Sequence, residues 1–480
     1  MDKKVFTSTW KLIAIYFFVI FTAISINILL TLDITGPYIG IRICATDLII
    51  PVIGIIFLYN CLYNRIYPEF KAKHGWALII IISIWMIVGL INGYLYTGTI
   101  VKWALFNKFL GWYVLIFYLI IGMYIGNYEL NLKILFFKLL IITTWIICIA
   151  ELLIFWFYTH GYFYEYKFIS LHHRVLGLYQ NPNAFGIFLA VIYLILLHSI
   201  KNKLLFNKYS VITGSALLLT TIYFTYSRSA WLGLCVGCIT AVYFDKKIIK
   251  YIIYTLFVAC IFYISAYSQY TKNYNDKIIE YIYLDCKKII NEIQKVTVNL
   301  NNISENQNKI KKSDVGKNTI QKKEKSNVVK QKKNKIIRKK PNLISLKSRI
   351  LTDNFSTRIF ILKRSLGYFK ESPLIGIGLG SYLWKSKNDG IPSNESTIHN
   401  SVNWLLVELG IIGLLIFSIF TFTCIRAILL EKNESNNPLL PTYTMISIIA
   451  VMLGASIGTE VLYQRYYWLL LGIFLVKNKN

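Results

Sequence analysis

The chain has 480 residues, of which 56% are hydrophobic and only 16% are charged, and its mean hydropathy is +0.52. Soluble globular proteins have about 25% charged residues, so this composition excludes an ordinary soluble domain and favours an integral membrane protein. The formal net charge is +29. Much of it lies in one polar segment, 309–340, and the rest flanks apolar runs. We therefore expect anionic lipid or anionic glycan as partners, and no nucleic acid.

Apolar runs of about 18 residues or more recur along the chain, and each is long enough to cross a bilayer as a helix. The predicted fold is an all-α polytopic integral membrane protein with about twelve transmembrane helices. The first run follows Lys3 and Lys4 and has no small-residue cleavage site, so we interpret it as a retained span. The predicted spans are 11–31, 40–62, 76–94, 105–126, 132–158, 183–200, 209–227, 229–244, 248–267, 400–429, 440–457 and 459–476.

Basic residues concentrate in the short loops on one side of this layout, which is the pattern of cytoplasmic loops. With both termini in the cytoplasm, the predicted organisation has three parts. An N-terminal membrane domain, 1–267, holds about nine spans and an external loop at 159–182. A large external loop, 268–399, lies between spans nine and ten and contains a Lys-rich insert, 301–340, predicted to be disordered. A C-terminal membrane domain, 400–480, holds about three spans.

Three arginines from separate segments are predicted to lie at the outer membrane surface. Arg174 is in the loop 159–182, Arg228 is in the turn between spans seven and eight, and Arg358 is in the large loop. The guanidinium group is permanently charged and binds phosphate in a bidentate manner. Together these residues would suit a diphosphate held at the level of the lipid headgroups. The alternative is that they simply extend their charges into the headgroup region.

A histidine and two carboxylates complete the candidate residues. His399 stands beside Asn400 at the start of span ten, and its near-neutral pKa would let it accept a proton from an attacking hydroxyl. The alternative is an ordinary polar residue at a helix entrance. Glu408 lies inside span ten and Glu151 inside span five, and carboxylates within a membrane are functional candidates or structural partners of arginines.

Two ion pairs between neighbouring residues are predicted to be structural, namely Arg42–Asp47 and Glu460–Arg465. The predicted outer loops contain no Asp-x-Asp metal motif, so we expect neither a metal nor another cofactor.

Several of these residues stand in motifs that resemble the O-antigen ligase and O-antigen polymerase superfamily. The C-terminal motif comprises Arg358, the run PLIGIGLG at 373–380, His399-Asn400-Ser401 and Glu408-Leu-Gly. The upstream motifs are Arg174-x2-Gly177-x3-Asn181-Pro182-Asn183 and Ser227-Arg228-Ser229. The Lys-rich insert 301–340 departs from the usual pattern of that superfamily.

The resemblance implies a membrane glycosyltransferase that acts on the outer face of the bacterial inner (cytoplasmic) membrane. Such enzymes take a glycan from undecaprenyl diphosphate and pass it to a hydroxyl of another glycan or of lipid A core, with no metal and no ATP. Carried over to this chain, Arg174 and Arg358 would bind the diphosphate, with Arg228 as a weaker candidate. His399 would orient or deprotonate the acceptor hydroxyl, with Asn400 and Glu408 in supporting positions. The motifs leave polymerase and ligase both open, as well as the sugars.

Two other functions are compatible with a polytopic chain of this kind. A polysaccharide exporter or flippase would carry charges along a central cavity and show inverted repeats. A scaffold would use the basic loop to hold anionic polymers. In this sequence the candidate charges gather at one predicted surface, which favours the enzyme.

Overall fold

The computed structural model describes residues 27–30, 41–44, 47, 51, 55, 59, 62–63, 68–127, 129–159, 174–179, 181–200, 204–263, 354–391, 398–430 and 440–477. The predicted spans 11–31 and 40–62 therefore lie mostly outside the described residues, and the insert 301–340 lies entirely outside them.

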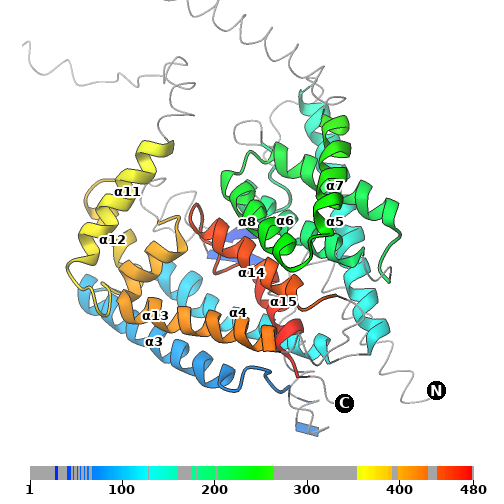
Figure 1. Ribbon diagram of the computed structural model, residues 1–480. Coiled ribbons are helices and arrows are strands. Elements are labelled where there is room, and N and C mark those ends of the chain that lie inside the picture. Colours follow the sequence, from blue (N-terminus) through cyan, green and yellow to red (C-terminus); the bar gives the residue numbers. More distant parts are fainter. Residues whose placement is uncertain are drawn as a thin grey trace, which may run out of the picture. The chain divides into compact units, whose positions relative to one another are not determined.

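The described chain is mostly helical (Figure 1), as expected. Its longer helices are α3 (Gly75–Thr97), α4 (Gly111–Gly126), α5 (Leu130–Thr159), α6 (Pro182–Ser199), α7 (Lys208–Phe224), α8 (Arg228–Phe244), Ile248–Tyr263, α11 (Asn354–Phe369), α13 (Ser401–Leu430), α14 (Tyr443–Ser456) and α15 (Arg465–Leu475). Two short helices complete the set, namely a π-helix, η1 (Ala104–Leu110), and α12 (Ser381–Asn388).

Five segments among the described residues are helical, long and apolar enough to cross a membrane: Gly75–Thr97, Ala104–Gly126, Leu130–Phe157, Pro182–Ser199 and Ser401–Leu430. Each coincides with a predicted span to within a few residues. Four shorter apolar helices, Arg228–Phe244, Ile248–Tyr263, Tyr443–Ser456 and Arg465–Leu475, also fall on predicted spans. The total of twelve and the external position of the large loop stay predictions.

A short hairpin replaces helix at the edges of the first two predicted spans, so the predicted helical edges were wrong there. Strand β1 (Asn27–Leu30) pairs antiparallel with β2 (Ile41–Cys44), with Leu29 opposite Arg42. Both tetrapeptides contain β-branched isoleucine, which favours extended backbone. The sequence between them contains Gly36 and Pro37, which are unfavourable inside a helix.

Two helix starts in the central part of the chain are fixed by polar caps. The Asn181 side chain accepts from the backbone N–H of Asn183 at 2.9 Å, with Pro182 in the first turn of α6. Ser227 caps α8 through the N–H of Ala230, at 3.2 Å. Such caps satisfy backbone donors that have no partner within the helix, so α6 and α8 begin at defined residues.

Three contacts join helix ends that the predicted alternation of the spans puts on one side, although the topology itself stays a prediction. Two contacts join residues predicted to lie on the inner side: Lys71 Nζ donates to the carbonyl of Phe474 at 3.0 Å, and Tyr443 donates to Asp245 at 3.4 Å. On the predicted outer side, Asn400 Nδ2 donates to the carbonyl of Ile457 at 2.9 Å. In each contact, the two helix ends are ones that the alternating direction of successive spans predicts to lie on the same side.

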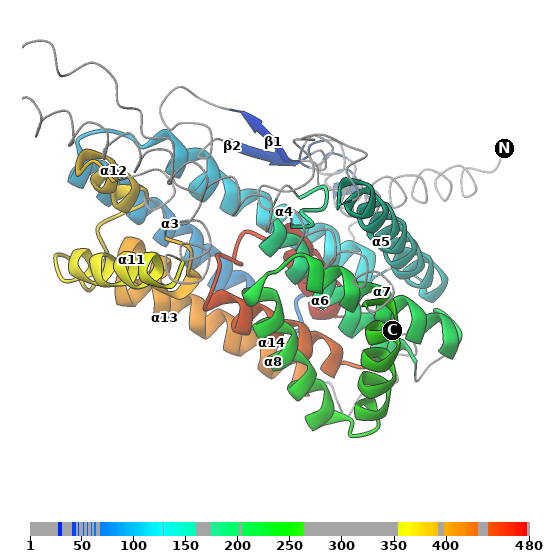
Figure 2. The same cartoon turned by 90° about the horizontal axis from the view of Figure 1, so that it is seen from above.

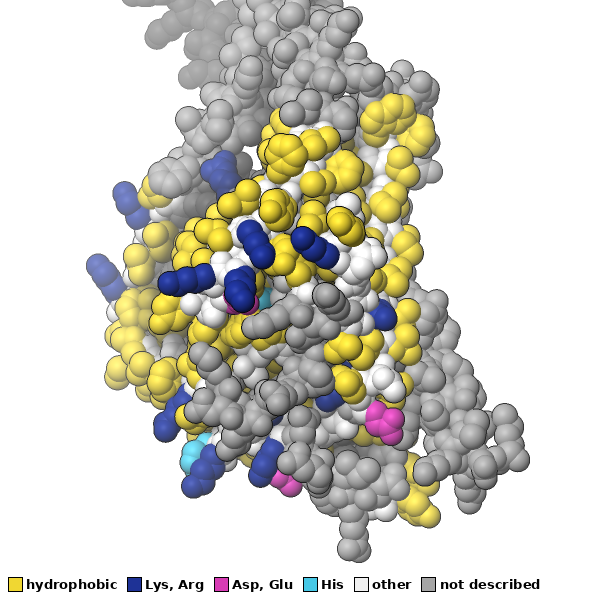
Figure 3. Space-filling view, turned by 45° about the vertical axis from the view of Figure 1, so that its right-hand side comes forward, with side chains coloured by type: hydrophobic (Ala, Val, Ile, Leu, Met, Phe, Trp, Pro, Cys, Tyr) yellow, Lys and Arg dark blue, Asp and Glu magenta, His cyan; other side chains and the backbone are white. Residues whose placement is uncertain are grey.

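The surface has the apolar character that a lipid environment requires. Figure 3 shows a face on which hydrophobic side chains cover most of the described area, with Lys and Arg side chains among them. On α3, Ile80 is 57% exposed and Ile84 is 54% exposed. A soluble protein seldom exposes so large a continuous apolar area, so these helix faces are suited to lipid contact.

The run Pro373–Gly380 forms an irregular segment that packs between α3 and α13. Helix α13 is broken at Gly410, where φ is 73° and ψ is −176°. The run enters this break and exchanges hydrogen bonds with it. The N–H groups of Ile377 and Gly378 donate to the carbonyls of Val407 and Glu408, at 2.9 and 3.0 Å.

The exchange is reciprocal. The N–H groups of Ile411 and Ile412, which in a continuous helix would bond to Val407 and Glu408, instead donate to the carbonyls of Pro373 and Leu374 at 3.0 and 3.2 Å. Two helical hydrogen bonds are thus replaced by four between the run and the helix. Irregular backbone within a membrane-spanning segment is tolerated only where protein satisfies its polar groups. At this break in the span candidate Ser401–Leu430, the run and α13 satisfy each other's groups.

Helix α3 satisfies the remaining groups of this segment. Trp85 Nε1 donates to the carbonyl of Leu409 at 3.0 Å, and Asn92 Nδ2 donates to that of Gly376 at 2.5 Å. The N–H of Leu379 donates to the carbonyl of Gly89 at 2.8 Å. Both α13 and the run that enters its break are therefore bonded to α3.

Gly378 is the position in the run least tolerant of a side chain. Its φ is +91°, and a Cβ atom there would collide with the backbone of Gly93 on α3. We expect Gly378→Ala to destabilise the protein by at least about 2 kcal/mol, from left-handed backbone and overpacking together. The matched control is Gly367→Ala, because no atom lies within 4 Å of a Cβ built at Gly367 in α11. Thermal unfolding in detergent, followed by tryptophan fluorescence, measures both. Equal melting temperatures for the two variants would contradict the packing described.

Candidate active site

Arg174 is anchored to the end of α7. Its Nε donates to the carbonyl of Thr225 at 2.8 Å, and its Nη2 donates to that of Tyr226 at 3.2 Å and to Asn183 Oδ1 at 3.4 Å. The carbonyls at a helix C-terminus carry partial negative charge, so the half-buried guanidinium complements the end of α7. Arg174 is thus held at the turn from which α8 begins.

Arg228 is the first residue of α8 and is exposed. Because Arg174 is bonded to Thr225 and Tyr226, two of the three candidate arginines meet at one turn. Their segments are separate in the sequence, and the turn between α7 and α8 is where the two meet.

His399 is exposed and immediately precedes α13, whose cap is Asn400. Asn400 Oδ1 accepts from the N–H of Asn403 at 2.9 Å, while its Nδ2 donates to the carbonyl of Ile457. Asn400 therefore both begins α13 and ties it to the end of α14. The backbone next to His399 is held on two sides.

The α14 end also lies near the start of α8. These two helices pack side by side (Figure 2), and a Cβ at Gly233 of α8 would lie 2.7 Å from the carbonyl of Val451 and 3.2 Å from Ala455. Gly233 is little more than one turn after Arg228, and Ala455 is in the last turn of α14. Arg174, Arg228 and His399 consequently gather at the same end of the helices.

Arg358 lies on α11, whose backbone is described at that residue, although its side chain is outside the described part. Asn403 Nδ2 donates to Ser365 Oγ at 2.6 Å, so α11 contacts the first turn of α13 (Figure 2). Arg358 precedes Ser365 by about two helical turns, or about 10 Å along the axis. The helix that carries Arg358 is therefore in direct contact with the helix that follows His399.

Glu408 does not lie on the surface with His399 but is buried two turns further along α13. Its carboxylate accepts from Trp404 Nε1 at 2.7 Å and is hydrogen-bonded to the backbone of Gly380. It ties the end of the glycine run to α13. Glu151 acts comparably on α5, where its buried carboxylate is hydrogen-bonded to the backbone of Gly177, three residues after Arg174.

The predicted ion pair Glu460–Arg465 is corrected by the structure, whereas the pair Arg42–Asp47 stays a prediction because the Arg42 side chain lies outside the described part. Arg465 pairs with Asp47, with Nε–Oδ1 at 2.7 Å and Nη2–Oδ2 at 2.6 Å, rather than with Glu460. Glu460 instead pairs with Lys108. The prediction of Glu460–Arg465 relied on closeness within one hairpin, whereas helix packing brought residues from distant spans together.

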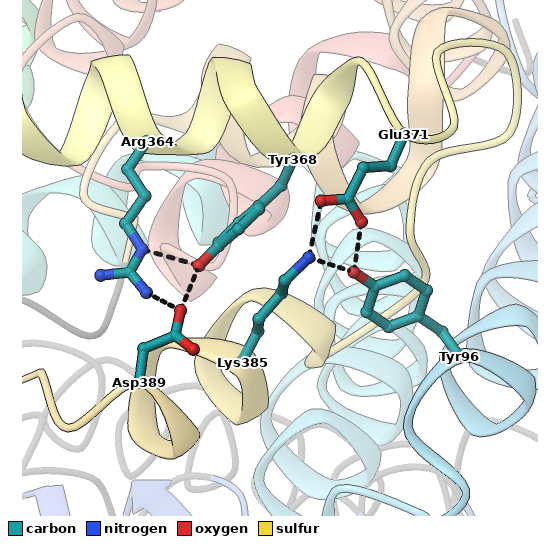
Figure 4. Close-up of polar contacts among 6 residues, drawn as sticks. All are labelled: Tyr96, Arg364, Tyr368, Glu371, Lys385 and Asp389. Carbon is teal, nitrogen blue, oxygen red and sulfur yellow. Dashed lines mark hydrogen bonds and ion pairs between the residues drawn. The ribbon is translucent and has the colours of Figure 1, made fainter.

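Two polar clusters, which sequence reasoning missed, fasten α11 to its neighbours (Figure 4). In the first, Lys385 of α12 donates to Glu371 at 2.6 Å and to the Tyr96 hydroxyl at 2.7 Å. Tyr96, near the end of α3, donates to the other oxygen of Glu371 at 2.5 Å. The only available signal was the clustering of charges around the glycine run.

The second cluster joins α11 to the end of α12. Arg364 Nε donates to the Tyr368 hydroxyl at 2.7 Å, and that hydroxyl donates to Asp389 at 2.8 Å. Arg364 also forms an ion pair with Asp389. Together the clusters hold α11, and hence the backbone of Arg358, against α12 and α3.

The first cluster changes the protonation of its members. Burial by itself raises the pKa of Glu371, but the hydrogen bonds from Lys385 and Tyr96 outweigh it and lower that pKa. Burial by itself lowers the pKa of Lys385, and its hydrogen bonds with Glu371 and Tyr96 reverse this and raise it. Both shifts favour the charged pair at neutral pH.

Among the described residues, no group of three or more His, Cys, Asp or Glu side chains is placed to hold a metal ion. Metal independence stays a prediction.

Residues 213–418 match the family model described as O-Antigen ligase. The match confirms the resemblance to the O-antigen ligase and polymerase superfamily, and supports a membrane protein with an O-antigen ligase-type function. It spans Arg228, Arg358, His399 and Glu408, while Arg174 precedes it. No curated protein matches the chain.

The lowered pKa of Glu371 gives a pH-dependent contribution to stability. A carboxyl with a depressed folded-state pKa stabilises the fold above its ordinary value of about 4.3 and loses this effect as the pH falls through the lowered value. At neutral pH, Glu371→Gln should lower the unfolding free energy by about 1 kcal/mol or less, because the cluster is partly exposed.

The difference in melting temperature between Glu371→Gln and the unsubstituted protein should shrink as the pH falls below the ordinary carboxyl pKa. Glu129→Gln, at an exposed residue preceding α5, is the matched control and should show no such trend. A Glu371→Gln difference that stayed constant with pH would contradict the ion pair.

Proposed function

We propose that this chain is a membrane glycosyltransferase that transfers or polymerises glycan from undecaprenyl diphosphate onto a hydroxyl acceptor. The reaction would take place at the outer face of the bacterial inner membrane. The match to the O-Antigen ligase family supports the class of function. The observation that carries the proposal further is the gathering of Arg174, Arg228 and His399 at one end of the helices, with α11 in contact there through Ser365.

The chemistry requires a leaving group, a base and an acceptor. The glycosidic C–O bond to the diphosphate breaks, and undecaprenyl diphosphate leaves with the bonding electrons. Arg174 and Arg358, with Arg228 in a lesser role, would stabilise the negative charge that develops on the departing phosphate. The acceptor hydroxyl attacks the anomeric carbon, and His399 takes its proton.

The position of Arg174 supports this role in a specific way. Its Nε and Nη2 atoms hold it to the turn at Thr225 and Tyr226. Helix α8 begins at Arg228. Its first backbone N–H groups and the positive end of its helix dipole therefore lie at the connection between α7 and α8 that Arg174 contacts. Such helix starts favour bound phosphate, so a diphosphate there would meet both arginines and the α8 N-terminus.

The proposed reaction needs neither a metal nor ATP, and its acceptor is a glycan or lipid A core. Anionic lipid is proposed to surround the basic loops. The proposed function covers both a polymerase and a ligase. A purified, reconstituted protein supplied with a lipid-linked repeat unit separates them. Laddered lipid-linked products would identify a polymerase, whereas a single shift of added lipid A core would identify a ligase. Transport of the lipid-linked unit without a new glycosidic bond would instead support an exporter or flippase and refute the proposal.

Substitution at the site provides the direct test of residue roles. His399→Ala should lower the transfer rate by about 10²–10⁴-fold, the usual contribution of a general base. Arg358→Ala should abolish transfer by weakening the hold on the diphosphate, with membrane insertion intact. The control is His74→Ala, an exposed histidine at the predicted inner end, which should leave transfer unchanged. Near-normal transfer by His399→Ala at equal protein level would refute the general-base role.

A further inference from the structure

Lys108 is a lysine buried inside the predicted span 105–126, with 2% of its surface exposed. Its ammonium group pairs with Glu460, which lies in the connection between α14 and α15. Three aromatic rings surround the same group: Trp103 at 5.0 Å, Trp404 at 4.3 Å and Tyr463 at 4.6 Å from Nζ to the ring centroid. A cation held in this way is desolvated, ion-paired and stabilised by the ring faces.

The π-helix η1 presents Lys108 to this environment. Residues Ala104–Leu110 have the wider turn of a π-helix and continue directly into α4. Such segments interrupt regular α-helix and are frequent at functional sites. The backbone of η1 takes part as well, since the Tyr463 hydroxyl donates to the carbonyl of Lys108 at 2.9 Å. Both the side chain and the backbone of Lys108 therefore hold the segment 457–463.

That segment, here called the outer hairpin (457–463), is in turn bonded to the start of α13. The carbonyl of Ile457 accepts from Asn400, and the N–H of Val461 donates to Ser401 Oγ at 2.8 Å. The rings of Trp404 and Tyr463 meet edge to face, with centroids 5.8 Å apart. Three residues that closely follow His399 in sequence, at positions 400, 401 and 404, thus contact the hairpin or Lys108 itself.

We propose that Lys108 is a positioning residue for His399, acting by fixing the outer hairpin (457–463) against the first turn of α13. This inference rests on the proposed function for the meaning of His399. Lys108 itself is shielded from the surface by Trp404, Tyr463 and Trp103, so it does not touch the substrate. Its effect passes through Glu460 and Tyr463 to the hairpin, and from the hairpin through Asn400 and Ser401 to the backbone beside His399.

The strength of the arrangement explains why the position of His399 depends on it. The hairpin meets α13 through two hydrogen bonds, whereas η1 holds it through the Tyr463 hydrogen bond and through an ion pair whose lysine is buried and whose carboxylate is 25% exposed. Removing one partner of a buried pair leaves an uncompensated charge, which is far more disruptive than losing an exposed contact. Without the ammonium group, Glu460 would be driven towards water and would carry the hairpin away from α13.

The geometry can be read without measuring glycan transfer. The Val461 N–H donates to Ser401 Oγ at 2.8 Å, so cysteines at these two positions would report whether the hairpin stays against α13. In a Ser401→Cys/Val461→Cys variant of the full chain in membranes, mild oxidation should join the two residues, and peptide mass spectrometry identifies the link. Addition of Lys108→Met should lower the yield of this link severalfold. Addition of Lys133→Met, which removes another lysine from an apolar helix at the predicted inner end, should leave the yield unchanged.

Kinetics of the otherwise native protein test the consequence for the site. Lys108→Met should lower kcat for transfer by up to about 100-fold, as expected when a reacting group is misplaced by about 1 Å. The KM for the lipid-linked donor should change little, because the arginines that bind the diphosphate are left in place. Lys108→Arg, which keeps the charge, should recover a large part of kcat, and Lys133→Met should behave like the unsubstituted protein.

Several results would overturn the inference. An unchanged cross-link yield in Lys108→Met would show that Lys108 does not fix the hairpin. A lowered yield with unchanged kcat would show that the hairpin does not position His399. Equal losses of folded protein, kcat and donor affinity in Lys108→Met and Lys133→Met would indicate a purely structural lysine. The cross-link can be measured without the lipid-linked glycan donor. If the unsubstituted protein showed no transfer activity, the proposed function would be refuted. The role of Lys108 in fixing the hairpin would still be tested by the cross-link.

Discussion

The insertion of Pro373–Gly380 into the break of α13 is the constraint on which the C-terminal half depends. A broken helix and an irregular loop are each costly at membrane depth, because their backbone groups have no water to bond with. Here each supplies the other's missing partners, with Ile377 and Gly378 donating to α13 and Ile411 and Ile412 donating back. Neither element would be stable without the other, so they must form together.

This mutual dependence explains how a long loop can carry precise chemistry. The glycine run is flanked by α11, which carries Arg358, and by α12, whose Lys385 reaches back to Glu371. Helix α13, which the run enters, begins directly after His399. One segment thus sets the positions of both elements on which the proposed diphosphate-binding and acceptor-activating residues stand. Trp85 and Asn92 extend the same support to α3, outside the family match.

The charged contacts around the site fall into two physical kinds. Those of α11 and α12 are partly exposed, with Glu371 at 41% and Asp389 at 48% side-chain exposure, so each contributes little and is screened by salt. Lys108 and Glu460 lie largely out of water, with 3% and 25% exposure. The exposed clusters therefore hold α11 only weakly, whereas the pair of Lys108 and Glu460 holds the outer hairpin (457–463) more strongly.

The sequence by itself determined the apolar helices from Gly75 onwards that the structure describes, with their approximate ends, because the length of an apolar run reflects the thickness of the bilayer. It also identified Arg174, Arg228 and His399–Asn400 as polar residues at predicted helix ends, and alternation of the spans placed those ends on one side. Only the tertiary structure decided what lies opposite each buried charge: Asp47 with Arg465 and Lys108 with Glu460 join distant spans. In the sequence Lys108 stands among apolar residues, and nothing there indicates its partner. The sequence also could not predict that the glycine run inserts into α13. A glycine run indicates which backbone angles are allowed, but which helix it enters depends on how the spans pack.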